Sequence, residues 1–276
     1  MEIDDKYKNY GTLNRLEYIE TQMKKAEQHE RLYHATKVES LISIIKNKEL
    51  WLSNLNNVND TQERKNIDFK EYRNSTYVVC FSYSEELAPH HWEEYGGEAD
   101  GVLIGIKNHK FWTSDIVFLN SQNGLVEGED NIIFKNIDDG ILKAKAFFIN
   151  SMKLVEIDYL PSGYSKDRYH IAEIQEGGQY IIPALTAIQK DATGWSIKGK
   201  KRNWYLENEV RLVVVLQKKD TQNQLFYYPK IRVKLKDSFF KDVVIKFSPK
   251  MNQRKKYEYR KQLEELLGKN NITFLE

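Results

Sequence analysis

Two glutamates and an arginine alternate just before a strongly apolar segment late in the chain. They are Glu207, Glu209 and Arg211, and the segment continues as Leu212 to Leu216. Strand side chains alternate with a period of two, so the spacing predicts a strand that carries the three charged groups on one face. A run that is apolar on both faces indicates a central strand. The three charged side chains are therefore a candidate functional surface at the beginning of a central strand. The alternative is an ordinary glutamate–arginine pair on a solvated face.

A histidine and a serine end two other short apolar segments. His34 ends the run that starts at Leu32, and Ser82 lies near the end of the strand expected over residues 76–84. Alternation groups Ser82 with Cys80 on one face of that strand and places Tyr83 on the other. Strand ends are places where sheets present side chains to ligands. The alternatives are a histidine that hydrogen-bonds inside the core and a strand that runs out into solvent.

The single cysteine and the six histidines form no recognised catalytic or metal motif. Cys80 lies in an apolar run with no flanking cation, so we expect it to be buried and inert. A lone cysteine forms no intramolecular disulfide and fits a reducing compartment. The chain contains no H-E-x-x-H or C-x-x-C pattern and no phosphate-binding glycine loop. We therefore expect no metal site, and a P-loop enzyme or Rossmann dehydrogenase is not indicated.

A dense basic run precedes the two glutamates. Four cations occupy five positions: Lys198, Lys200, Lys201 and Arg202. Such a run can bring nucleic-acid phosphates to a neighbouring site. The alternative is a solvated loop.

The sequence patterns predict that the elements that position these residues form an α+β fold. Helices are expected over residues 13–29, after a T-x-x-E capping box at Thr36 to Glu39, over 89–97 and over 251–267. A helical pattern interrupted by glycine and proline covers 166–191. Strands are expected over 31–35, 50–53, 76–84, 101–106, 143–159, 207–217, 225–235, 242–247 and 272–275.

Composition sets the class of protein but not its partner. The chain has 276 residues, of which 41% are hydrophobic and 30% charged, a balance typical of a folded domain. No flexible boundary divides it, which favours one domain built on a mixed sheet. The formal net charge is only +2, so no global attraction to nucleic acid is implied. The polar N-terminus and the absence of a long apolar stretch favour a cytoplasmic protein without membrane contact.

Several short motifs together resemble the bacterial family catalogued as domain of unknown function 2971. The motifs lie in one order between residues 31 and 276, and they are Leu32 to Thr36, Leu50 to Ser53, Asn59 to Glu63, Cys80 to Ser82, Trp92 to Tyr95 and Glu207 to Leu212. That family resembles a distant branch of the ADP-ribosyltransferases. The resemblance implies a split β-sandwich with flanking helices over residues 31–276. The helical extension expected at residues 1–30 comes from the helical spacing and has no counterpart in the family.

The resemblance also implies a site for NAD. The superfamily carries an aromatic-His or Arg pair on the first strand, a serine on a middle strand and E-x-E on a late one. These positions match Tyr33-His34, Ser82 and Glu207 to Glu209. Phe81-Ser82-Tyr83 departs from the family's Ser-Thr-Ser, which puts the nicotinamide-binding role in question.

Specific roles follow from the resemblance. Glu209 would stabilise an oxocarbenium-like transition state, and Glu207 would accept the proton of the nucleophile. His34 would hold a ribose hydroxyl and Ser82 would orient the nicotinamide. Tyr83 would stack on that ring, and Arg211 would pair with a carboxylate or contact the pyrophosphate.

The expected function is thus an NAD-dependent ADP-ribosyltransferase, by analogy a bacterial toxin or antiviral defence effector, with a nucleic-acid or protein acceptor. One alternative is a non-catalytic module that binds nucleotides or nucleic acid. Another is a nuclease-like hydrolase that uses carboxylates and metal.

Overall fold

The computed structural model describes residues 15–58, 76–87, 89–108, 116–117, 147–160, 174–176, 179–181, 189–191, 207–218 and 230–276. The described helices are α2 (Arg15–Gln28), α3 (Val38–Asn47), α5 (Pro89–Glu94) and α7 (Gln253–Leu267). The strands of the main sheet are β1 (Arg31–Lys37), β2 (Glu49–Asn54), β3 (Thr76–Ser82), β4 (Gly101–Lys107), β5 (Ile116–Val117), β6 (Phe147–Glu156), β11 (Glu209–Lys218), β12 (Lys230–Leu235), β13 (Val243–Phe247) and β14 (Ile272–Leu275).

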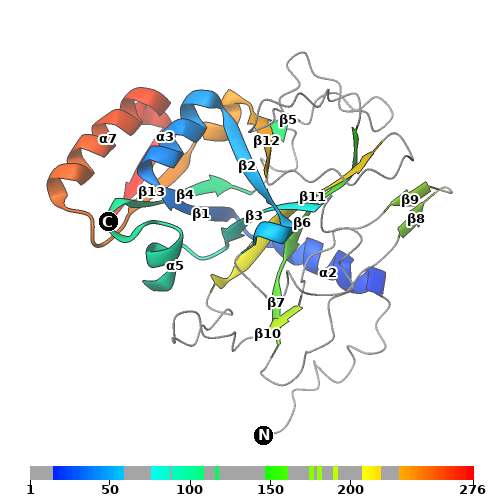
Figure 1. Ribbon diagram of the computed structural model, residues 1–276. Coiled ribbons are helices and arrows are strands. Elements are labelled where there is room, and N and C mark those ends of the chain that lie inside the picture. Colours follow the sequence, from blue (N-terminus) through cyan, green and yellow to red (C-terminus); the bar gives the residue numbers. More distant parts are fainter. Residues whose placement is uncertain are drawn as a thin grey trace, which may run out of the picture.

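These ten strands form a mostly antiparallel open sheet in a mixed α/β arrangement, consistent with the α+β class (Figure 1). The path runs β14-β13-β4-β1-β3-β2-β12-β5, and β11 pairs with both β3 and β6. β13 and β14 pair in parallel, whereas the other described pairings of this sheet are antiparallel. β11 therefore lies between two strands, as its two apolar faces predicted.

The sheet divides along one edge of β3. β11 pairs with β3 along its whole length, from Glu209 opposite Ser82 to Val215 opposite Thr76. Two strands share the other edge of β3. β1 pairs with the last residue of β3, at Tyr33↔Ser82, whereas β2 pairs near its beginning, at Ser53↔Val78 and Asn54↔Tyr77. β1 and β2 diverge over the stretch between these two pairings. This division opens the sheet beside the middle of β3.

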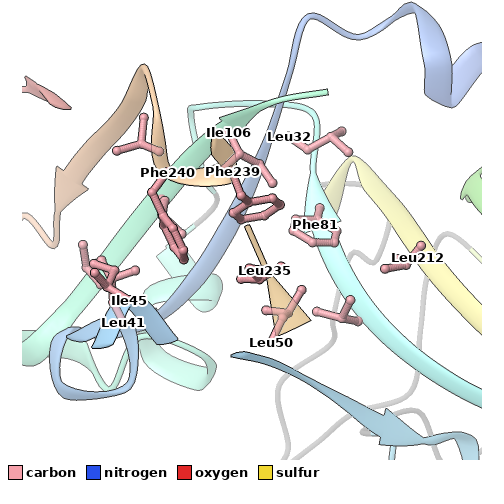
Figure 2. Packing of buried hydrophobic residues seen from close by; sticks show 14 of the residues in the cluster. Leu32, Leu41, Ile45, Leu50, Phe81, Ile106, Leu212, Leu235, Phe239 and Phe240 are labelled. Atoms are coloured by element: carbon pink, nitrogen blue, oxygen red, sulfur yellow. The ribbon is translucent and has the colours of Figure 1, made fainter. Parts of the chain in front are cut away.

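The main core lies between one face of the sheet and the helices α3 and α7. Buried residues from α3, including Leu41 and Ile45, pack with Phe239 and Phe240 and with sheet residues such as Phe81 (Figure 2). Figure 1 shows α3 and α7 side by side on this face. The short helix α5 packs on the other side of β1 and β4, where a second cluster of Tyr33, Trp92 and Leu103 is buried. The region around the division of the sheet thus has a packed layer on each side.

The predicted elements agree with the described ones except in three places: the capping box, residues 166–191, and the start of β11, which lies at Glu209 and not at residue 207. The capping box at Thr36 is wrong, because β1 extends through Lys37 and the N-cap of α3 is Lys37, without a side-chain cap bond. The prediction of helices over 166–191 is wrong for the residues described there. They form three short strands, β8 (Ile174–Glu176), β9 (Gln179–Ile181) and β10 (Gln189–Asp191). β8 and β9 pair antiparallel and are separated in sequence by Gly-Gly, which is a hairpin signal.

Two smaller sheets complete the described strands: β8 with β9, and β10 with β7 (Asp158–Leu160). None of the helices in the described part of the chain is both long enough and apolar enough to cross a membrane.

Candidate functional site

A cleft of about 430 Å³ opens where the sheet divides. Its walls come from β1, β2, β3, β11, the start of β12 and α5, so segments from most of the sequence meet there. Clefts that bind small ligands typically fall in the range of ~300–1,000 Å³. Tyr33, His34, Ser82, Glu207, Glu209 and Arg211, all candidate site residues, line it.

Three of these residues form a row across three adjacent strands. Tyr33 on β1 lies opposite Ser82 on β3, and Ser82 lies opposite Glu209 on β11. Directly opposed residues of neighbouring strands share a face and have Cβ atoms only ~4.5–5.5 Å apart. The row therefore sets a phenol-bearing, a hydroxyl-bearing and a carboxylate-bearing residue side by side on one face of the sheet.

Glu209 and Arg211 form a buried ion pair next to this row. Their side chains are 3% and 2% exposed, and Arg211 Nε donates to Glu209 Oε1 over 2.5 Å. The residues are two apart on β11, so both point to the same face. The pairing of Arg211 with a carboxylate follows the expectation. A solvated pair, which was the alternative, is excluded by the burial.

Glu207 reaches the cleft through a turn instead of a strand. β11 begins at Glu209, and Asn208 has φ 46°, in the left-handed region. The prediction that residue 207 begins the strand and shares a face with Glu209 by alternation is therefore wrong, although Glu207 does line the cleft and is only 6% exposed. Tyr95, which directly follows α5, donates from Oη to Glu207 Oε1 over 3.4 Å. Asparagine adopts this backbone conformation more readily than most residues, so the turn is encoded locally.

His34 lies in the wedge between the diverging strands. Its neighbour Tyr33 belongs to the row, so alternation puts His34 on the opposite face of β1, but the divergence lets its half-buried ring line the cleft. Nδ1 lies 3.0 Å from the carbonyl oxygen of Cys80. A carbonyl only accepts, so Nδ1 carries the hydrogen, and Nε2 of the neutral ring is an acceptor. Burial lowers the pKa of His34, which the bond to Cys80 partly offsets.

The ring of Tyr33 is held flat against β4. Gly105 lies opposite Tyr33, and a Cβ atom at that glycine would approach Tyr33 Cε1 to 2.5 Å. Tyr33 Oη lies 3.4 Å from Glu85 Oε2. Burial, and then the Glu85 charge, raise the pKa of the phenol, so it stays a hydrogen-bond donor.

Tyr83 is not part of the cleft, which corrects the expectation that it stacks on nicotinamide. Its ring stacks on His29 with centroids 4.2 Å apart and an interplanar angle of 2°. The reason is alternation, since Tyr83 follows Ser82 and packs on the core side with Phe81. Its backbone N–H donates to the Asn208 carbonyl over 2.9 Å, so Tyr83 supports the turn between the two glutamates.

Cys80 is exposed and lines the cleft, contrary to the expected burial. It lies opposite Arg211 on β11. The apolar residues around it in sequence do not cover it, because the division of the sheet beside β3 opens its face to the cleft.

Several cleft residues were not singled out as site residues from the sequence, among them Trp51 and Ser53 on β2, Glu94 on α5 and Lys230 at the start of β12. For the two β2 residues, alternation could have predicted their place. Leu50 and Leu52 are buried, so Trp51 and Ser53 lie on the other face of the strand. Lys230 gave no comparable signal.

The basic run Lys198, Lys200, Lys201 and Arg202 and the motif Asn59 to Glu63 lie outside the described residues. Within the described ranges, no group of three or more His, Cys, Asp or Glu side chains is placed to hold a metal ion.

Compared with models of known protein families, with curated proteins and with solved structures, the chain has no match. The family resemblance therefore rests on the motifs of the sequence alone.

Proposed function

We propose that this protein is an NAD-dependent ADP-ribosyltransferase whose reaction takes place in the cleft beside β3. The observation that carries the proposal is the row of Tyr33, Ser82 and Glu209 across three strands, at the point where the sheet divides. The row supports the proposal because it sets Ser82 and Glu209, two positions of the ADP-ribosyltransferase pattern, side by side, although the third position, His34, is not in the row. Tyr33 takes the first-strand place in the row, and His34 contributes from the wedge beside it.

The reaction would break the bond between ribose C1′ and the nicotinamide nitrogen. The electron pair of that bond goes to the nicotinamide ring, which leaves as a neutral molecule, and positive charge develops on the ribose. Preorganised charges aimed at a developing charge are often the largest catalytic contribution. Glu207 and Glu209 against one Arg211 leave a net charge of −1 beside the sugar.

The residues divide the remaining tasks by their chemistry. Arg211 holds the Glu209 carboxylate in place, and we assign this carboxylate to a ribose hydroxyl. The acceptor nucleophile then bonds to C1′, and Glu207 takes its proton. His34 offers the Nε2 lone pair to the other ribose hydroxyl. Ser82 Oγ accepts from the backbone N–H of Ser84 over 3.1 Å, which orients its O–H to donate to the nicotinamide amide.

The test is nicotinamide release from NAD in bacterial lysate supplemented with the purified protein. Glu209→Gln should lower the rate by ~10²–10³, the typical cost of removing one such electrostatic contact. Glu93→Gln is the matched control, because Glu93 is an exposed carboxylate on α5 that does not line the cleft. An active wild type and an equally active Glu209→Gln variant would reject the mechanism, and an inactive wild type would reject the function.

Two further measurements complete this test. Glu209 is buried in an ion pair, so the Gln variant needs a thermal unfolding curve to separate lost chemistry from lost folding. Because the pair is buried, we expect Glu209→Gln to lower the stability of the fold as well as the rate. Release that disappears with EDTA would favour a metal-dependent hydrolase.

A further inference from the structure

One histidine outside the cleft links the two segments that hold the turn between the cleft glutamates. His29 directly follows α2 and lies shortly before β1. Its ring stacks on Tyr83, with centroids 4.2 Å apart and an interplanar angle of 2°. Its Nε2 lies 2.6 Å from Glu156 Oε2, at the end of β6. A carboxylate only accepts, so Nε2 donates in this contact.

The two partners of this ring lead directly to the turn. Tyr83 donates its backbone N–H to the Asn208 carbonyl over 2.9 Å. The second partner, Glu156, is followed by Ile157, whose N–H donates to the Glu209 carbonyl over 2.8 Å. Two successive carbonyls of the turn are therefore held by the two segments that the histidine ring joins.

The histidine itself is fixed to the end of β4. Asn108 directly follows β4 and is 2% exposed, and its Nδ2 donates to the carbonyls of Ala26 and His29 over 2.6 and 2.7 Å. Its backbone N–H donates to the Glu30 carbonyl over 2.9 Å. The side chains of His29 and Glu156 are 23% and 17% exposed, so little water competes for their contact. The ring thus has a fixed place from which it can hold its two partners.

We propose that His29 is a positioning residue for the turn between Glu207 and Glu209. Its ring holds Tyr83 and Glu156, and through the backbone of these two segments it keeps both turn glutamates directed at the cleft. His29 does not line the cleft and acts only through its neighbours. Its effect on NAD cleavage rests on the proposed function. Its support of the turn does not, because that is a property of the folded chain.

The experiment measures hydrogen exchange of single backbone amides by NMR in the isotope-labelled full chain. The amides of Tyr83 and Ile157 report on the two hydrogen bonds of the turn. His29→Ala should speed the exchange of both about 2- to 12-fold, which corresponds to ~0.5–1.5 kcal/mol for a ring stack or a hydrogen bond. The amide of Leu235, which donates to the Lys48 carbonyl, is the internal reference and should keep its exchange rate.

Two variants that each remove one contact keep the test decisive if His29→Ala fails to fold. His29→Phe keeps a ring for the stack and removes the hydrogen bond to Glu156, so the Ile157 amide alone should exchange faster. His29→Gln keeps a side-chain N–H donor and removes the stack, so the Tyr83 amide alone should exchange faster. Asn252→Ala is the matched control, because it removes the N-cap of α7 and lowers stability without changing a His29 contact.

Unchanged exchange of both amides in the His29 variants, or the same acceleration in Asn252→Ala, overturns the proposal whatever the NAD assay shows. Nicotinamide release should fall by up to ~10²-fold in His29→Ala, the cost that a misplacement of about 1 Å can have, and should recover in part in His29→Phe. Faster exchange with full nicotinamide release overturns the positioning role. Faster exchange in a protein whose wild type releases no nicotinamide rejects the enzyme function and keeps His29 as a support of the turn.

Discussion

The buried charges of the cleft act as a set. Removing one partner of a buried ion pair typically costs ~3–5 kcal/mol, because the other charge stays in a poorly solvated place. Arg211 and Glu209 are such a pair. The same contact that holds the Glu209 carboxylate in place also offsets its charge, and Glu207 supplies the second carboxylate that leaves the site negative.

His34 should make the stability of the protein sensitive to acid. Its pKa in the folded protein is lowered by burial, so below the ordinary value of 6.5 the unfolded chain takes up a proton that the folded chain does not. The free energy of unfolding should therefore fall as the pH drops from 6.5 toward the lowered pKa. His34→Gln should reduce this dependence.

Urea unfolding of the wild type and of His34→Gln at pH 7.5 and pH 5.5 measures the effect. The difference between the two proteins isolates the histidine from other titrating groups. An identical pH dependence in both would show that His34 takes up its proton as readily in the folded protein as in the unfolded chain.

At the scale of an element, the start of β11 is shaped by one backbone conformation. Asn208 in the left-handed region turns the chain between Glu207 and Glu209. The turn is held from outside, because Tyr83 N donates to Asn208 O over 2.9 Å and Ile157 N donates to Glu209 O over 2.8 Å. Both glutamates can face the cleft only if this turn is kept.

Asn208→Val should lower both stability and NAD cleavage, whereas Asn208→Gly should preserve them. The left-handed conformation costs a residue with a Cβ atom roughly 1–2 kcal/mol, most of all a β-branched one, and costs glycine little. Thermal unfolding and nicotinamide release measured on both variants check this. Equal behaviour of the two variants would mean that the turn does not position Glu207.

At the scale of the whole molecule, α2 belongs to the folded body. Gln22 and Ala26 are fully buried, and Gln22 Nε2 donates to the Glu156 carbonyl of β6 over 3.1 Å. Asn108 Nδ2 donates to the carbonyls of Ala26 and His29 over 2.6 and 2.7 Å. The helix thus packs on the strand that flanks β11, which Figure 1 also shows.

Ala26→Asp should destabilise the fold by about 3–5 kcal/mol, because it buries an uncompensated carboxylate in the core. Lys24→Asp is the matched control, since Lys24 is exposed on the same helix. Chemical denaturation of the two variants makes the comparison. A similar small loss in both would show that α2 is a dispensable extension.

Local patterns were enough to predict most elements and several residues that line the cleft. The apolar run after Arg211 predicted a central strand, and alternation along β3 separated Ser82 from Phe81 and Tyr83. Such patterns depend only on neighbours in sequence and on the two-residue period of strands. The same patterns predicted that charged side chains lie at the ends of apolar strands.

The tertiary structure alone decided which side chains meet. The divergence of β1 and β2 along β3 exposes Cys80, brings the His34 ring into the cleft and places Trp51 opposite the carboxylates. It also makes Tyr33 the partner of Ser82, because strand register depends on pairing between segments about fifty residues apart. No local pattern contains that register, since it is set by how the two faces of the whole sheet are buried.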